Sequence, residues 1–223
     1  ILDDGGHFER SPMYHNIILE DVLDIINMSL FYPNVLPHAL LEELNAAATK
    51  MLVWSAYMSH PDGGVPYFND SVEGISPKHS HLVKYAMKIG LSCQNDDNEH
   101  GLTKLLDSGY LRYVDEAALF LIDVGQIGPD YQPGHAHADT LSFEVSIKQQ
   151  RVFVNSGISV YALGSQRIKE RGTASHNTVS INNMNSSDVW SSFRVGRRAY
   201  PTNLTMEKKC GFLEITCSHN GYD

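Results

Sequence analysis

Cysteine is scarce in this chain of 223 residues, and the three present, Cys93, Cys210 and Cys217, form no C-x-x-C pair. The spacing excludes a zinc ribbon and favours free buried thiols over a disulfide framework. Long apolar runs are lacking as well, since none approaches the roughly 20 residues that cross a bilayer. The first residues do not have the pattern of a signal peptide. We therefore expect a folded chain without a membrane span.

Positive charge is also in short supply, because 17 Lys and Arg face 26 Asp and Glu, for a formal net charge of -9. Residues 1–100 carry 5 basic and 14 acidic side chains, whereas residues 101–223 carry 12 of each. A nucleic-acid-binding protein needs a broader basic surface, so the sequence argues against a nucleic-acid partner. Residues 151–198 hold 7 basic and 2 acidic side chains, which leaves room for a local anion site.

Apolar residues make up 42% of the chain and charged residues 19%, which is typical of a protein with a real core. Helical periodicity dominates the first hundred residues. Ser11-Pro12 predicts a helix start, with Ser11 as the N-cap. A second helix is expected over residues 37–58. A third is expected to start at Ser76-Pro77, with Gly90 as its C-cap.

The apolar period changes to two after the polar residues 95–98, which predicts strands. The expected strands are 111–114, 118–124, 141–147, 151–155, 178–181 and 213–218. Helices followed by strands indicate an α+β chain or two separate domains. We place the boundary between 92 and 108, with domains at 1–98 and 99–223.

Three groups that bind protons or metals, His135, His137 and Asp139, lie two residues apart before an apolar segment. In an extended backbone their side chains would project from one face. His and Asp also serve as hydrogen-bonding residues at strand ends, so the motif alone leaves a structural role open. His176 and an oxygen donor could complete a zinc site with His137, provided that the fold brings them together.

Two further segments carry candidate residues. Tyr14 lies in the first turn of the predicted helix, where the helix dipole favours a phenolate and hence a proton carrier; a packing tyrosine is the alternative. The segment around Arg194 and Arg197 offers guanidinium groups that match a carboxylate or sulfate bidentately. Charges on a solvated strand edge are the alternative there.

Taken together, the segments resemble the heparinase II/III-like polysaccharide lyases. The matching motifs are DGGHFERSPMYH (residues 4–15), PYFND (66–70), GPDYQPGHAHAD (128–139), ASHNTV (174–179) and WSSFRVGRRA (190–199). The resemblance implies the end of an (α/α) toroid followed by the start of an antiparallel β-sandwich. It also implies a fragment, which leaves open whether these residues act alone.

The chemistry that the resemblance implies is β-elimination at a uronic acid, in which a base removes the C5 proton and the glycosidic oxygen leaves C4. Tyr14 corresponds to the proton-carrying tyrosine and His135 to its partner near the carboxylate. His7, Glu9, Arg194 and Arg197 are placed among the substrate-binding residues. The family's Asn or His that neutralises the uronate, on an earlier helix, has no match in this sequence.

The resemblance further implies a metal, usually zinc, held by His137, Asn155 and His176. Some members have a carboxylate where this sequence has Asn155, so a divalent ion should bind less well. An acidic polysaccharide as partner implies a periplasmic or secreted protein. Two alternatives remain: a non-catalytic carbohydrate-binding relative, and a hydrolase that uses Glu9 and Asp70 as paired carboxylates.

Overall fold

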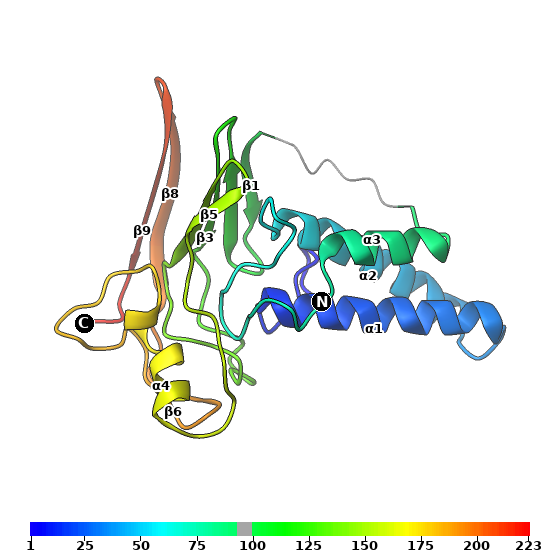
Figure 1. Cartoon of the computed structure of the whole chain (residues 1–223), viewed down its shortest axis with the longest axis horizontal. Helices are drawn as coiled ribbons and strands as arrows, with labels where there is room; N and C mark the ends of the chain where they lie inside the picture. Colours follow the sequence, from blue (N-terminus) through cyan, green and yellow to red (C-terminus); the bar gives the residue numbers. More distant parts are fainter. Residues whose placement is uncertain (93–99) are drawn as a thin grey trace.

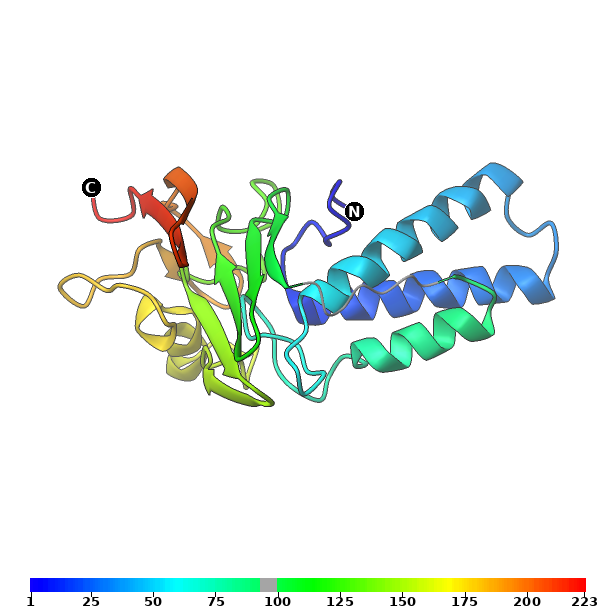
Figure 2. The ribbon, with the colours of Figure 1, turned by 90° about the horizontal axis from the view of Figure 1, so that it is seen from above.

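The computed structural model describes residues 1–92 and 100–223. The first three helices lie at one end of the molecule, and the strands, with a short fourth helix, lie at the other (Figures 1 and 2). The helical end consists of α1 (Pro12–Phe31), α2 (His38–Tyr57) and α3 (His79–Lys88). The β end begins with β1 (Gly101–Leu105), β2 (Tyr110–Val114), β3 (Ala118–Asp123), β4 (Phe143–Ile147) and β5 (Gln150–Phe153). The rest comprises α4 (Ser165–Arg171), η1 (Thr173–Ser175), β6 (Val189–Trp190), β7 (Arg194–Val195), β8 (Pro201–Lys209) and β9 (Phe212–His219).

The first helix begins where the sequence predicts. The Ser11 hydroxyl accepts a hydrogen bond from the Tyr14 amide (3.3 Å) and donates one to the Asp70 carbonyl (2.7 Å), so the N-cap also ties α1 to a distant loop. Pro12 follows it at the first helical position, where no amide hydrogen is needed. This anchoring fixes the position of Tyr14.

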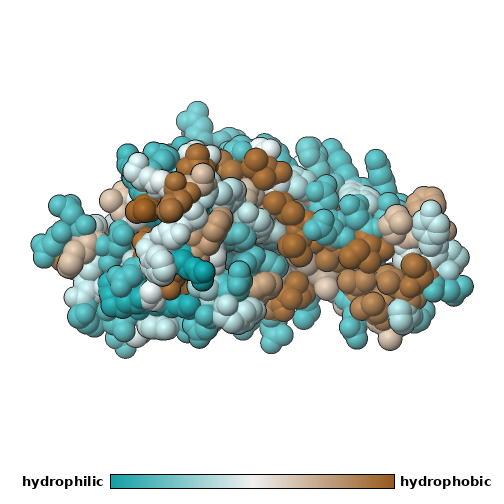
Figure 3. Space-filling view, turned by 90° about the horizontal axis from the view of Figure 1, so that it is seen from below, coloured by the Kyte–Doolittle hydropathy of each residue, from teal (hydrophilic) through white to brown (hydrophobic). Residues whose placement is uncertain are grey.

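The three helices share one apolar core. Its buried side chains are Leu19, Leu23 and Ile26 of α1, Ala48, Met51 and Leu52 of α2, and Leu82 and Ala86 of α3. Ile26 of α1 faces this core, whereas the neighbouring Ile25 is 43% exposed. Figure 3 shows a hydrophobic area on the surface of the helical end. Within the described ranges, no helix is both long and apolar enough to span a membrane.

Strands β1 to β5 form an antiparallel meander in sequence order. Pairings such as Leu111 with Ile122 and Leu121 with Glu144 set its register. A second apolar core joins the end of α2 to the sheet. It consists of Trp54 in α2, Met58 just after α2, and Phe68, Leu105, Tyr110, Leu119 and Leu121. Strands β6–β7 and β8–β9 form two separate hairpins. The helical part is therefore followed by antiparallel sheets, as the sequence predicts.

Several local predictions are wrong. Cys210 was expected to be buried but is exposed. Helix α3 starts at His79, with Lys78 as its N-cap and Ile89 as its C-cap, and not at Ser76-Pro77 with Gly90 as its C-cap.

Residues 178–181 form no strand; Thr178 instead donates its hydroxyl to the Thr140 carbonyl (2.8 Å). The strand expected over 141–147 starts at Phe143, because Leu141 lies in a turn with φ +62°. The polar segment 95–98 and the boundary between 98 and 99 lie outside the described residues.

Candidate functional site

The motif with His135, His137 and Asp139 lies in the loop between β3 and β4 and is not a strand. Its side chains alternate nevertheless. Ala136 and Ala138 pack into an apolar cluster with Ile127 and Val189, whereas the opposite side of the loop faces residues 69–70. There the Asp70 amide donates to the His135 carbonyl (3.0 Å), and the His137 amide donates to Asn69 Oδ1 (3.2 Å). The side chains of His137 and Asp139 also turn to residues 69–70, through Asp70 Oδ1 (2.7 Å) and the Asn69 amide (3.2 Å), whereas the His135 ring lies against Tyr14.

His135 and Tyr14 meet face to face. Their ring centroids are 3.9 Å apart and their planes differ by 4°. The Tyr14 hydroxyl lies 2.9 Å from the hydroxyl of Tyr161, which precedes α4. Burial, followed by the hydrogen bond with Tyr14, raises the pKa of Tyr161, so Tyr161 stays protonated and can donate. The result is a pair of phenol groups beside an imidazole.

Glu9 lies between two imidazoles. Its carboxylate is 3.3 Å from His135 Nδ1 and 3.9 Å from His7 Nδ1. Burial lowers the pKa of His7 to about 4, with a smaller contribution from His135, so His7 is neutral near pH 7. The His135 Nδ1 atom is buried, whereas the His135 side chain as a whole is 20% exposed. The Nε2 edge is therefore the part of the ring that a ligand can reach.

A buried chain of charged groups lies behind the Tyr14–His135 pair. Arg167 binds the Asp70 carboxylate with both terminal nitrogens, and its guanidinium lies over the rings of Tyr161 and Phe193, 5.2 and 5.4 Å from their centroids. Asp70 Oδ1 is 2.7 Å from His137 Nε2. Burial by itself would raise the pKa of Asp70, but the hydrogen bonds from His137 and Arg167 outweigh it and lower that pKa.

Asp70 is fully buried in this ion pair, so it cannot serve as an acid or base on a sugar. The hydrolase alternative, which needs Glu9 and Asp70 as a working carboxylate pair, is therefore not supported by the geometry.

Two of the three residues expected to hold a metal, His137 and His176, lie next to each other. His137 Nδ1 is 3.1 Å from His176 Nε2. Asn155 is buried beside residues 175–177, where its Oδ1 accepts the Asn177 amide (2.9 Å). Its Nδ2 has no hydrogen-bond partner within the described part of the chain. Among residues 1–92 and 100–223, no three His, Cys, Asp or Glu side chains form a metal-binding group.

The two arginines expected to bind an anion differ in their surroundings. Arg194 is exposed on β7, next to Phe193. Arg197 instead directs its guanidinium to the Ser186, Gly221 and Asn185 carbonyls and to Asp188, at 2.6 to 3.4 Å. Arg197 thus holds a turn of its own chain, whereas the Arg194 guanidinium has no partner among the residues that the structure describes.

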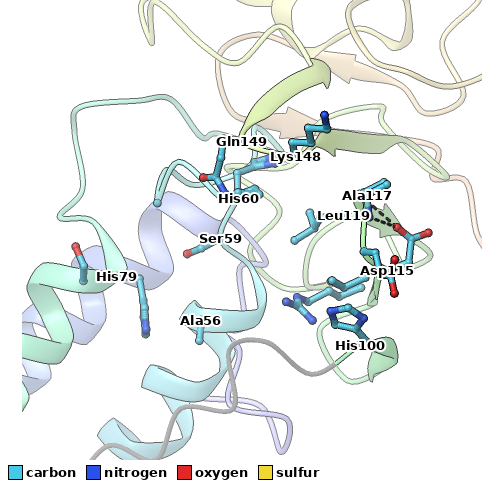
Figure 4. Close-up of a pocket in the computed structure, with 17 residues that line it drawn as sticks. Ala56, Ser59, His60, His79, His100, Asp115, Ala117, Leu119, Lys148 and Gln149 are labelled. Carbon is cyan, nitrogen blue, oxygen red and sulfur yellow. Dashed lines mark hydrogen bonds between the residues drawn. The ribbon is translucent and has the colours of Figure 1, made fainter.

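A cavity of about 470 Å³ lies between the end of α2 and the β2–β3 hairpin (Figure 4). Three histidines line it: His60, His79 and His100. The His60 ring is already held by Ser146 Oγ (2.8 Å) and Glu144 Oε2 (2.7 Å). None of the residues predicted for the site lines this cavity, so it is a separate feature.

Sequence reasoning missed Tyr161 and Arg167. Neither lies in a motif, and each acts through a contact with a residue more than 90 positions away in the chain. The excess of basic residues in 151–198 was the one available signal for Arg167.

Comparisons with known proteins agree on one family. The model for the heparinase II/III N-terminus matches residues 1–97, and the model for the heparinase II/III-like C-terminal region matches residues 97–223. A heparin-sulfate lyase of Bacteroides stercoris is 28% identical over 208 residues, which cover 83% of this chain and 30% of that protein.

Solved structures show the same fold at low sequence identity. A heparinase III gene product is similar with a TM-score of 0.71 and 19% identity, and the match covers 99% of this chain and 35% of that one. A heparan sulfate lyase from Pedobacter heparinus is similar with a TM-score of 0.67, 19% identity and the same two coverages. The chain thus spans about a third of the length of these relatives.

Proposed function

The chain belongs to the heparinase II/III-like family, and on this basis we propose that it is part of a polysaccharide lyase that cleaves a uronic-acid-containing acidic polysaccharide by β-elimination. The observation that carries the proposal is the stacked pair of Tyr14 and His135, with the Tyr161 hydroxyl 2.9 Å from that of Tyr14. Tyr14 and His135 come from different parts of the chain, and an elimination needs a proton-carrying group such as Tyr14 next to a group that faces the substrate carboxylate.

Tyr14 carries the proton in this scheme. A neutral Tyr161 donates a hydrogen bond to the Tyr14 oxygen and so stabilises a phenolate, which removes the C5 proton of the uronate. The same hydroxyl, once protonated, returns the proton to the glycosidic oxygen as it leaves C4. The proton is only transferred, so the step needs no external oxidant or reductant.

His135 positions the sugar next to Tyr14. Its Nδ1 faces Glu9, which fixes the ring and leaves Nε2 for the substrate carboxylate. Negative charge accumulates on that carboxylate when the C5 proton is removed, and a nearby donor lowers the cost of this charge. His7, on the other side of Glu9, completes the wall of the site.

The facing nitrogens of His137 and His176 support the proposal of a zinc ion between them. His176 Nδ1 faces the Gly172 carbonyl (2.9 Å) and must donate to it, so His176 Nε2 carries a lone pair. If His137 Nε2 donates to Asp70, its Nδ1 also carries a lone pair, and the two lone pairs face each other across 3.1 Å. Outer partners of this kind, a carboxylate and a carbonyl, orient histidines that bind zinc.

We assign His137, His176 and Asn155 to this ion. Because Asn155 contributes a neutral oxygen, the ion should bind less tightly than at a site with a carboxylate. When bound, the metal would hold together the loops that carry His135 and His176, which is a structural role.

The complete architecture belongs to the same proposal. Helices α1 to α3 form part of an (α/α) toroid, and the antiparallel sheets form part of a β-sandwich, with the site at their junction. The named relatives are lyases of heparin or heparan sulfate, and we propose a substrate of that chemical class, an acidic polymer of uronic acid and hexosamine. Such a substrate implies a periplasmic or secreted location.

The ultraviolet absorbance of the reaction mixture tests the proposal, because only elimination creates a double bond conjugated with the carboxylate. The chain is incubated with a panel of uronate polysaccharides, and both absorbance and new reducing ends are measured. We expect both to rise together. New reducing ends without absorbance would indicate a hydrolase, and binding without either signal would indicate a non-catalytic carbohydrate-binding protein.

A further inference from the structure

A polar hollow of about 760 Å³ lies directly beside the Tyr14–His135 pair. Residues 130–134 line one side of it and residues 191–195, with Arg198, line the other. The first of these segments leads straight into His135. The hollow is thus continuous with the site along the chain, while no residue of the proton-transfer machinery lines it.

The hollow contains one uncommitted positive charge. Arg194 is exposed, and its guanidinium forms no hydrogen bond or ion pair with any residue that the structure describes. Arg198 also lines the hollow, but its guanidinium binds the Asp130 carboxylate (2.7 Å) and the Asp130 carbonyl (3.0 Å). An anion entering the hollow therefore finds Arg194 as its partner.

Aromatic side chains flank this charge. Phe193 is 45% exposed, and its ring lies edge-on to His135 at 6.4 Å and stacked on Tyr161 at 6.0 Å. Tyr131 on the other side is 75% exposed and stacks on Phe8 at 5.8 Å. Exposed rings beside an arginine suit the apolar face and the anionic group of an acidic sugar.

A buried arginine fixes the hollow relative to His135. Arg171 is fully buried, and its guanidinium binds the Ala136 carbonyl (2.8 and 3.1 Å) and the Arg194 carbonyl (3.2 Å). Ala136 lies between His135 and His137, so one rigid group joins the backbone of Arg194 to the backbone of the site. Such an arrangement keeps two neighbouring sugar-binding positions in register.

We propose that this hollow is a subsite for the acidic sugar next to the cleaved bond, with Arg194 pairing to its carboxylate or sulfate. The assignment rests on the proposed function of the neighbouring site. It makes Arg194 a specificity-determining residue that acts in binding and has no part in the proton transfer.

Binding of two hexasaccharides by calorimetry tests the assignment. One alternates hexuronic acid with N-acetylglucosamine and has no sulfate, and the other is its N-sulfated counterpart. The protein carries Tyr14→Phe so that the ligand is not consumed. Arg194→Gln is compared with Lys208→Gln, which removes one exposed positive charge near the turn of the β8–β9 hairpin.

We expect Arg194→Gln to weaken binding about tenfold, the usual effect of losing a charge-assisted hydrogen bond, and Lys208→Gln to change it less than twofold. If Arg194→Gln loses affinity for both hexasaccharides, the carboxylate is the partner of Arg194. If it loses affinity for the sulfated hexasaccharide alone, the sulfate is the partner. The subsite proposal would be overturned if Arg194→Gln bound as tightly as the Tyr14→Phe protein that carries Arg194, or if that Tyr14→Phe protein did not bind at all.

The absorbance assay distinguishes this result from failure of the lyase proposal. If Arg194→Gln still catalyses elimination with an unchanged KM, the lyase proposal stands and the subsite proposal fails. Binding that depends on Arg194 without any elimination would keep the subsite and remove the lyase.

Discussion

At the scale of single residues, His15 shows how a buried side chain is fixed in one protonation state. Its Nδ1 accepts the His7 amide (3.1 Å), so its Nε2 must carry the hydrogen that is donated to the Met51 carbonyl (2.9 Å). Both nitrogens are satisfied only in the neutral ring. Burial above all lowers the pKa of His15 to about 3.

A pH dependence of stability follows. Between pH 6.5 and about 3, the unfolded chain binds a proton at His15 that the folded chain does not, so the free energy of unfolding falls as the pH falls. Each such histidine contributes a slope of up to about 1.4 kcal/mol per pH unit. The free energy of unfolding, measured in urea between pH 6.5 and 5, should depend less steeply on pH in His15→Gln. Equal slopes for His15→Gln and the unsubstituted protein would contradict the account.

Asn155 allows a direct test of the metal assignment. Its Nδ2 has no hydrogen-bond partner, so Asn155→Asp sacrifices no such bond and supplies the carboxylate that zinc prefers. We expect zinc affinity, measured by titration and by the rise in melting temperature, to increase about tenfold or more. The neighbouring Asn177→Asp adds the same charge as a control. Equal affinities for the two variants would exclude Asn155 as a ligand.

At the scale of secondary structure elements, local signals were enough to predict α1. Ser11-Pro12 and the apolar period placed its start correctly, because the N-cap and the first turn are determined by neighbours in the chain. The alternation of His137 and Asp139 with Ala136 and Ala138, which pack into an apolar cluster, matches the period of two, although a loop provides it. The contact of Tyr14 with Tyr161 and that of Asp70 with Arg167 could not be predicted, since only the tertiary fold brings these residues together.

Two hairpin turns test how closely the sheet is packed. Gly109 and Gly211 have the same φ of +88°, but a Cβ on Gly109 would lie 2.2 Å from the Gly125 Cα, whereas one on Gly211 would meet nothing within 4 Å. Gly211→Ala should cost about 1 kcal/mol of unfolding free energy from backbone strain alone. Gly109→Ala should cost about 1–3 kcal/mol more, because the backbones must separate. If both variants lost the same free energy of unfolding in urea, the backbones at Gly109 and Gly125 would not be in close contact.

At the scale of the whole molecule, the site lies where the helical end meets the sheets. Tyr14 comes from the first turn of α1, His135 from the loop between β3 and β4, and Tyr161 from the segment before α4. The Ser11 cap binds the Asp70 carbonyl, and the Asp70 side chain binds Arg167 and His137. Neither end of the molecule contains the site alone, so its geometry depends on how the two ends pack.

The most direct test of the central claim is kcat/KM for elimination by Tyr14→Phe, followed by ultraviolet absorbance. We predict a loss of at least about 100-fold, because the proton carrier is removed while the ring that stacks on His135 remains. Tyr161→Phe should lose less, and Tyr32→Phe, an exposed position just after α1, should match the parent. A parent that produces no unsaturated product, or a Tyr14→Phe variant that keeps its activity, would contradict the account.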